Sequence, residues 1–438
     1  MFRVIIAQTG QTFRIFSPVS GVQELRNFIT KLFFFAVGHD FVIKIGMESI
    51  NSLNIGSLPG IIFGAGKFSE LPKIIPLYGQ HALIFIGGES LKKSGRWNTL
   101  APQLERAQIK YHAVSVWEEP ATDAIDAIAL GFRKTPIDVV VAIGGGSVMD
   151  FGKAVSAMLA AEGSVKDYLE GVGIRKPTGA KVPFIAVPTT AGTGSEATNN
   201  AVVCDRKEGY KKSLRHKAYT PDIALVDPEL TLSLPRHITM ACGLDAVAQL
   251  IEAYTSTQAD PAVDALVLKA LADASESLLP LVHGNSHNIA LRTKMSSAAL
   301  VSGIALTRSG LGVVHGIAGP LGGLCPVPHG IACGKLLFPA MTFVIKKIFD
   351  EKNIAAQKRF AEIGKVLAGT DPGHDDISNC KQFLDVLDRW TRAFKIPPLS
   401  RFGMTAQHME KTMDLADSKN SPAALSREEV KVVLEVVR

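Results

Sequence analysis

Short apolar runs that end in glycine or proline recur through the first half of the chain. Residues 81–88 read HALIFIGG, and residues 138–146 repeat this design with β-branched residues followed by three glycines. Residues 183–188 and 222–227 supply two further runs of the same kind. Continuous apolar runs of this length are typical of parallel strands that are buried on both faces. The pattern therefore predicts four strands of one buried sheet.

Helical spacing of apolar residues separates the first two strands and then dominates the second half of the chain. Residues 99–107 and 123–132 lie between strands, and this alternation favours an open α/β sheet. After residue 228 strand patterns largely vanish, and five stretches show helical spacing: 241–254, 263–279, 290–306, 355–367 and 380–394. We therefore expect an α/β domain over residues 47–228 and an all-helical domain over residues 229–438. Residues 1–46 are a leader of unknown status.

Composition and charge exclude several classes of protein. Hydrophobic residues make up 47% and charged residues 20% of the 438 residues, as in ordinary soluble globular proteins. The net charge of +6 is scattered rather than gathered in a basic block, so we expect no nucleic-acid partner. The longest early apolar stretch, residues 28–37, is interrupted by Lys31 and is too short to span a bilayer, so we expect no membrane partner.

The cysteines indicate a reducing compartment. There are five of them and they form no CxxC pair, so neither a disulfide framework nor a zinc cage is favoured. Reduced thiols in a cytoplasmic protein fit this pattern best.

A glycine-rich loop follows the strongest predicted strand. Residues 144–150 read GGGSVMD and open a helix. Glycines let backbone N–H groups approach a diphosphate, and the N-terminus of a helix adds a favourable dipole. The usual GxGxxG fingerprint is absent, so a tight turn with Asp150 as the dipole partner of the helix stays open as an alternative.

A second loop of similar chemistry follows the next strand. Residues 188–196 read PTTAGTGSE and combine hydroxyl groups with glycines. Two anion-suited loops at the carboxyl edge of one sheet would suit a dinucleotide. The alternative is a Thr/Ser-rich turn that caps a helix.

Together, GGGSxxD and PTTAGTGSE resemble the iron-containing alcohol dehydrogenase family, which is related to glycerol dehydrogenases and dehydroquinate synthases. The resemblance continues through DPELT at 227–231, GLDAVAQLIEAY at 243–254 and the segment 310–330, and runs from about residue 53 to the end. It implies an α/β domain that binds NAD(P), a helical domain that binds metal, and catalysis in the cleft between them. The implied activity is hydride transfer between NAD(P)(H) and a small alcohol, aldehyde or ketone.

The resemblance also implies which residues bind the cofactor. In NAD-preferring relatives an aspartate after the first strand binds the adenine ribose, and Gly87 occupies that place here. An acid would repel a 2′-phosphate, so its absence favours NADP over NAD, although Glu89 nearby could restore the repulsion. Lys211 resembles the ribose-contacting lysine, with Lys212 as the alternative register. The remaining matched cofactor positions are Gly145, Gly146, Ser147, Asp150, Thr189, Thr190, Thr193 and Ser195.

The metal pocket that the resemblance implies is only partly retained. The family holds Fe²⁺ or Zn²⁺ with an aspartate, a histidine four residues later, and two histidines fourteen residues apart. Asp245, His315 and His329 match, and we expect them to be catalytic. Gln249 stands at the first histidine position and completes the expected set of four metal-site residues; its carboxamide oxygen is a poor replacement for imidazole on these ions, though tolerable for harder cations. A further histidine that is thought to serve proton transfer is replaced by Gly319.

Several alternatives to a metal site stay open. Asp245 could simply stabilise its helix, the two histidines could be interior residues, and Gln249 could hydrogen-bond Asp245. Metal binding could have been lost, as in the maleylacetate reductases of the same family, which would leave a metal-independent carbonyl reductase. A lyase like dehydroquinate synthase would need a pocket rich in lysine and arginine, and residues 243–330 contain few of either. A non-catalytic cofactor-binding relative and a homo-oligomer also stay open.

Overall fold

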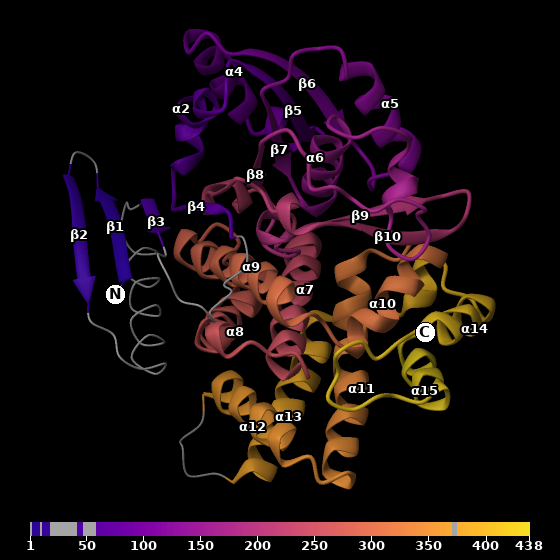
Figure 1. Ribbon diagram of the computed structural model, residues 1–438. Coiled ribbons are helices and arrows are strands. Elements are labelled where there is room, and N and C mark those ends of the chain that lie inside the picture. The colour runs from indigo at the N-terminus through magenta and orange to yellow at the C-terminus, as the bar shows by residue number, and fades with distance from the viewer. Residues whose placement is uncertain (1, 9–10, 18–41, 47–57, 370–374) are drawn as a thin grey trace. The chain divides into compact units, whose positions relative to one another are not determined.

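The computed structural model describes residues 2–8, 11–17, 42–46, 58–369 and 375–438 (Figure 1). These residues form two compact units. Unit 1 comprises residues 1–190, 195–203 and 212–233, and unit 2 comprises residues 191–194, 204–211 and 234–438, apart from those not described. The apolar stretch 28–37 lies outside the described residues.

Unit 1 contains a parallel six-stranded sheet in the order β4-β11-β8-β7-β5-β6. The four predicted strands are confirmed as β5, β7, β8 and β11, and every residue of β7 and β8 is buried. The sequence pattern did not indicate the two edge strands, β4 and β6. The bounds are β4 (Gly60–Phe63), β5 (His81–Gly87), β6 (Lys110–Val116), β7 (Val139–Gly144), β8 (Phe184–Pro188) and β11 (Ile223–Val226).

Helices connect the strands of this sheet. The predicted stretches 99–107 and 123–132 are confirmed within α4 (Arg96–Arg106) and α5 (Thr122–Phe132), and two short helices, α2 (Leu71–Ile74) and α3 (Ser90–Lys93), precede them. The helix α6 (Gly146–Met158) follows β7 directly. It packs closely on the sheet, because a Cβ atom at Gly152 would lie 2.9 Å from the Cβ of Ala142 and 3.0 Å from the Phe184 ring.

The strand order creates a switch point beside β5. β5 pairs with β6 on one side and with β7 on the other, and the chain continues from β7 to β8, away from β6. The connections after β5 and β7 therefore diverge, and open α/β sheets bind ligands at the carboxyl ends of the strands at such a switch point. Gly87 ends β5 and Gly144 ends β7, so Gly87 and the glycine-rich loop 144–150 both lie at this edge of the sheet.

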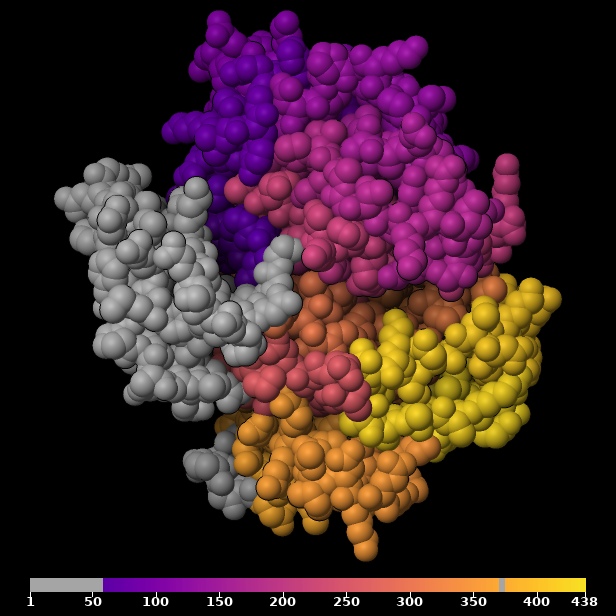
Figure 2. Space-filling model, viewed as in Figure 1, coloured from indigo at the N-terminus to yellow at the C-terminus, as the bar shows by residue number. Residues whose placement is uncertain are grey.

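Unit 2 is predominantly helical, which confirms the prediction of an α/β part followed by a helical part (Figure 1). The five predicted helical stretches lie within α7 (Arg236–Thr255), α8 (Pro261–Val282), α9 (Ile289–Ser309), α12 (Ile354–Ala368) and α13 (Asp376–Phe394). The helices that were not predicted are α10 (Val313–Leu324), α11 (His329–Asp350), α14 (Ala406–Leu415) and α15 (Arg427–Val437). Figure 2 shows α14 and α15 (yellow) as a continuous layer on one face of unit 2.

One helix in the described part of the chain is long and apolar enough to cross a membrane. It is α9, and 67% of its apolar window is buried within the protein. A core helix of a helical bundle passes the same test of length and composition, so this finding adds no membrane partner.

Two small sheets complete the described structure. In the leader, β1 (Phe2–Gln8), β2 (Gln11–Ser17) and β3 (Val42–Gly46) form an antiparallel sheet in the order β2-β1-β3, which the sequence pattern did not indicate. The strands β9 (Asn200–Asp205) and β10 (Tyr210–Arg215) form a two-stranded sheet.

Candidate active site

The two predicted cofactor loops contact each other in unit 1. The N–H of Thr189 donates to the carbonyl oxygen of Gly144 at 2.9 Å. A Cβ atom at Gly145 would lie 3.3 Å from Cγ2 of Thr190, so a larger residue at this position would press on the second loop. Gly145 precedes the first residue of α6, and Gly145, Gly146, Ser147, Thr189 and Thr190 all keep partly exposed surface. The first residues of α6 thus keep exposed surface at the carboxyl end of β7, where a diphosphate would lie against the helix N-terminus.

Asp150 and Ser195 are bonded to each other. The Ser195 hydroxyl donates to Oδ1 of Asp150, and Oδ2 of Asp150 accepts the N–H of Val202 at 3.0 Å. Ser195 is buried and Asp150 is half-buried. These contacts fix the second loop to α6, so both residues position the loop whatever else they bind.

A buried lysine that the sequence analysis missed organises the same loop. Lys153 Nζ donates to the carbonyl oxygens of Ser195 (2.8 Å), Thr198 (2.9 Å) and Asn200 (2.8 Å), and to the Thr198 hydroxyl (2.9 Å). Burial lowers the pKa of Lys153 to about 8, against the attraction of Asp150. The only signal in the sequence was a lysine on the otherwise apolar inner side of α6.

The loop after β5 lies against the glycine loop. A Cβ atom at Gly87 would lie 3.1 Å from Cγ2 of Val148 and 3.4 Å from Cα of Gly144. Glu89, the acid that could replace the missing aspartate, is exposed and pairs with Lys93 at 2.8 Å. That hydrogen bond and the charge of Lys93 lower the pKa of Glu89, so its carboxylate already has a cationic partner.

Two predicted cofactor residues fall in unit 2 rather than in unit 1. Thr193 belongs to unit 2 and is half-buried. Lys211 also belongs to unit 2, where its Nζ lies 3.5 Å from the position that a Cβ atom at Gly322 would take. Lys212, the alternative register, belongs to unit 1, and its Nζ lies 3.9 Å from the corresponding position at Gly171.

Asp245, His315 and His329 converge within unit 2, and a cysteine joins them. Asp245 lies in the middle of α7, His315 in the first turn of α10, and His329 is the first residue of α11. Asp245 Oδ1 lies 3.3 Å from His315 Nε2 and 3.6 Å from His329 Nε2. Cys333, one turn after His329, places its Sγ 3.6 Å from Nε2 of both histidines. All four donor atoms lie within 4.8 Å of one another, which suits a bound metal ion. We call these four residues the donor cluster.

The side chain of Gln249 is bonded elsewhere. It lies one helical turn after Asp245 and is buried, and its Oε1 accepts the hydroxyl of Ser302 on α9 at 2.8 Å. This bond uses one of the two acceptor sites of the carboxamide oxygen and ties the side chain of Gln249 to α9. A hydrogen bond to Asp245, the alternative considered from the sequence, would use the NH₂ group of Gln249 instead.

A buried glutamate orients His315. Glu252 Oε2 lies 2.5 Å from Nδ1 of His315, and Oε1 accepts the N–H of Val314 at 2.6 Å. A carboxylate on the far nitrogen fixes the ring orientation and the tautomer of a metal-binding histidine, and increases its basicity. The sequence analysis missed Glu252, although it stands seven residues after Asp245 and so two turns along the same helix face.

The electrostatics of the donor cluster favour charged forms. Burial disfavours the imidazolium of His315, but Cys333 and Glu252 outweigh that effect and raise its pKa well above the ordinary value. Burial likewise disfavours the thiolate of Cys333, but His315 and His329 lower its pKa overall. The pKa of Asp245 is also lowered, because its two histidine neighbours outweigh burial. Only His329 reaches the surface, with 39% of its side chain exposed.

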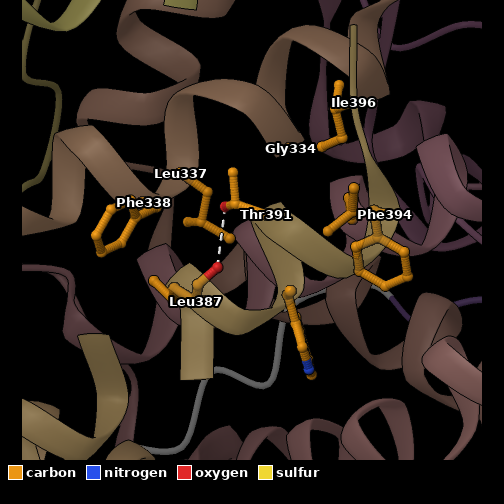
Figure 3. Close-up of a pocket in the computed structure, with 9 residues that line it drawn as sticks. Gly334, Leu337, Phe338, Leu387, Thr391, Phe394 and Ile396 are labelled. Atoms are coloured by element: carbon orange, nitrogen blue, oxygen red, sulfur yellow. Dashed lines mark hydrogen bonds between the residues drawn. The ribbon is translucent and has the colours of Figure 1, made fainter. Parts of the chain in front are cut away.

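Tight apolar packing holds α7 and α11, the helices that carry three of the four donors. Leu244 and Gly334, which adjoin Asp245 and Cys333, line a small cavity, and a Cβ atom at Gly334 would lie 2.5 Å from Cδ1 of Leu244. The hydroxyl of Thr391 in this cavity donates to the carbonyl of Leu387 at 2.9 Å (Figure 3). The close contact of Gly334 with Leu244 therefore lets α7 and α11 pack closely beside the donor cluster. The other residues that line the cavity are Leu337, Phe338, Trp390, Phe394 and Ile396.

Gly319 leaves open space on α10. It follows His315 by one turn, and no atom lies within 4 Å of the position its Cβ would take. The place of the missing proton-transfer histidine has therefore not been filled by a neighbouring side chain of the described residues.

Comparisons with known proteins agree with this architecture. Residues 59–228 match the family model "Iron-containing alcohol dehydrogenase", and residues 239–437 match "Fe-containing alcohol dehydrogenase family, C-terminal". The probable alcohol dehydrogenase EutG of Escherichia coli K12 is 33% identical over 70% of this chain and 75% of its own length. The NAD-dependent methanol dehydrogenase of Bacillus methanolicus is 31% identical over 77% of this chain and 86% of its own length.

A solved structure gives the same result for the fold. The crystal structure of a 1,3-propanediol oxidoreductase matches with a TM-score of 0.79 at 26% identity, and the match covers 87% of this chain and 99% of that one. The family models cover both the cofactor loops and the helices that carry the donor cluster. The chain belongs to the iron-containing alcohol dehydrogenase family.

Proposed function

We propose that this member of the family transfers a hydride between NADP(H) and a small alcohol or aldehyde, with a divalent metal, Fe²⁺ or Zn²⁺, held by Asp245, His315 and His329. The observation that carries the proposal is the convergence of these three side chains from α7, α10 and α11, in which Oδ1 of Asp245 lies 3.3 and 3.6 Å from Nε2 of the two histidines. Separations of this size suit donors that share one ion about 2.0–2.2 Å away.

A bound metal ion and the nicotinamide cofactor would supply the chemistry of hydride transfer. A bound metal supplies a Lewis acid for the oxygen of the alcohol or carbonyl group. The nicotinamide supplies or accepts the hydride. The chain's own part is to bind and orient these groups: Asp245 contributes charge, Glu252 fixes the His315 ring, and the loops at 144–150 and 188–196 hold the diphosphate.

The route of the proton follows from the open space at Gly319. Since no side chain of the described residues fills that place, we propose that the alcohol proton leaves through water or a ribose hydroxyl. Such a route depends on solvent access, which the partly exposed His329 provides on its side of the donor cluster.

The preference for NADP rests on Gly87. No acid stands at the end of β5, and Glu89 is engaged by Lys93. A 2′-phosphate would therefore meet less repulsion here than in a protein with an aspartate at this position. The Bacillus methanolicus relative is named NAD-dependent, so cofactor choice has to be measured for this chain.

We further propose a cytoplasmic location, because all five cysteines are free thiols. The substrate should be a small alcohol or its aldehyde, in line with the names of the two relatives.

A second candidate is a metal-independent carbonyl reductase. The bond between Gln249 and Ser302 favours it, because this bond ties the carboxamide at the position of the lost imidazole ligand to α9. The two candidates differ in one measurable property, the dependence of turnover on metal.

Both are tested by steady-state assays with NADPH and NADH on a panel of short alcohols and aldehydes, before and after chelation and again after addition of Fe²⁺ or Zn²⁺. We expect turnover with NADPH that disappears on chelation and returns with metal. Full turnover after chelation, with no metal detected, would establish the metal-independent reductase instead. No hydride transfer with any substrate or metal would contradict both.

A further inference from the structure

We propose that Cys333 is the fourth metal ligand, so that the donor cluster is an Asp-His-His-Cys site that selects zinc over iron. The inference rests on the proposed function, because it concerns the same ion, and it names the ligand that replaces the imidazole absent at Gln249. Cys333 lies one turn into α11, and its side chain is completely buried.

The separations of the donor atoms fit tetrahedral zinc. With nitrogen and oxygen about 2.0–2.1 Å and sulfur about 2.3 Å from the ion, a regular tetrahedron places nitrogen about 3.4 Å from oxygen and sulfur about 3.6 Å from nitrogen. Sγ of Cys333 lies 3.6 Å from Nε2 of both histidines, and Oδ1 of Asp245 lies 3.3 and 3.6 Å from the same atoms. These four separations match those of tetrahedral zinc, and all four donor atoms lie within 4.8 Å of one another.

The simpler interpretation of Cys333 is a buried thiol in contact with two rings. Cys380 shows that role in the same unit: it is buried on α13, and its Sγ donates to the carbonyl of Gln357 at 3.4 Å. Cys333 differs because its neighbours are three donors on three separate helices rather than one backbone carbonyl. Cys380 is consequently a matched control.

The charges around the donor cluster suit a bound cation. Asp245 and Glu252 are buried carboxylates on either side of the His315 ring, and a thiolate at Cys333 adds a third negative charge opposite the +2 of zinc. The carboxamide of Gln249, by contrast, carries no charge, and its oxygen accepts the hydroxyl of Ser302.

Thiolate ligation decides between the two metals. Thiolate is a soft ligand that favours zinc over the harder ferrous ion, and affinity for mixed N/O/S sites increases from Fe²⁺ to Zn²⁺ in any case. Replacement of an imidazole ligand by a thiolate should therefore increase the affinity of this site for Zn²⁺ relative to Fe²⁺.

The test uses the full chain and the metals alone. The wild-type protein is compared with Cys333→Ser, Cys333→Ala and the control Cys380→Ser, after equal supply of Zn²⁺ and Fe²⁺. The measurements are metal content, zinc affinity by chelator competition, and zinc X-ray absorption. The spectrum of the Co²⁺-substituted protein reports thiolate ligation through charge-transfer absorption. The double variant Cys333→Ser with Gln249→His tests whether an imidazole can replace the thiolate.

We expect one zinc per wild-type chain with one sulfur scatterer at about 2.3 Å. Both Cys333 variants should lose the sulfur signal and the Co²⁺ charge-transfer band and bind zinc at least about 100-fold more weakly, beyond what loss of an outer-shell contact causes. Cys380→Ser should keep the wild-type spectra and affinity. The double variant should regain affinity without the sulfur signal.

Zinc bound without a sulfur scatterer, unchanged affinity in Cys333→Ser, or preferential loading with iron would each overturn the inference. Metal-dependent turnover in any of these cases would leave the proposed function intact. Conversely, a zinc–sulfur site in a protein that transfers no hydride would support the ligand assignment and contradict the proposed function.

Discussion

Replacement of Glu252 by glutamine should weaken metal binding without removing any ligand. The buried Glu252 carboxylate accepts two hydrogen bonds. Its Oε1 accepts the N–H of Val314 at 2.6 Å, and its Oε2 accepts Nδ1–H of His315 at 2.5 Å. A carboxamide has one acceptor oxygen, so in Glu252→Gln its NH₂ group must face one of these two donors. One of the two hydrogen bonds is lost in either orientation.

The size of the effect follows from that count. A hydrogen bond to a charged group contributes about 1.5–3 kcal/mol, and loss of a carboxylate behind a metal-binding histidine costs about 10–100-fold in metal affinity. We therefore expect zinc to bind Glu252→Gln about 10–100-fold more weakly, because the ring of His315 is no longer fixed with Nε2 toward Asp245.

Chelator competition measures that affinity, and thermal unfolding with and without metal separates it from stability. Asp264→Asn is the matched control, since Asp264 is also buried and pairs with Arg359 at 2.7 Å. The control should unfold at a lower temperature yet bind zinc normally. A Glu252→Gln protein with zinc affinity within about threefold of wild type would refute the reasoning, as would an equal loss of affinity in the control.

Three further predictions concern other parts of the site. Gly87→Asp should lower kcat/KM for NADPH more than for NADH, because the new carboxylate would repel the 2′-phosphate. In the control Gly87→Ala the new Cβ meets the same Val148 methyl group at 3.1 Å, so an equal effect of alanine would show that bulk rather than charge is responsible. Gly319→His has room for its Cβ, and the new imidazole should raise turnover and move the pH–rate profile toward an apparent pKa of about 6.5. The same result with Gly319→Ala would exclude proton transfer as the cause. Burial raises the pKa of Glu196 from 4.5 to about 7, so the folded protein binds more protons than the unfolded chain between these values and its stability should fall as pH rises through this window. The free energy of unfolding, measured with urea at pH 5, 6 and 7, should fall less steeply with pH in Glu196→Gln than in the wild type. An equal pH dependence in the two proteins would count against that pKa.

The buried elements of the fold could be read from the sequence alone. β7 and β8 are continuous apolar runs because both of their faces are covered, and α7, α8 and α9 show helical spacing over long stretches. The loops at 144–150 and 188–196 were likewise recognisable, because glycine and hydroxyl residues directly after a buried strand are a local signal. Edge elements gave no such signal: β6 is exposed or half-buried at every position except its last residue, and β4 has only four residues.

The sequence by itself determined the spacing of Asp245, His315 and His329, and with it the expectation of a shared site. Only the tertiary structure decided which other side chains join them. Cys333 becomes a candidate ligand, Glu252 orients His315, and Gln249 is held by Ser302 only because particular helices pack side by side. The physical reason is that helical periodicity shows which face of a helix is buried but not what packs against it. The residues that contact that face lie tens of residues away in the chain, and which of them do so depends on how the helices cross.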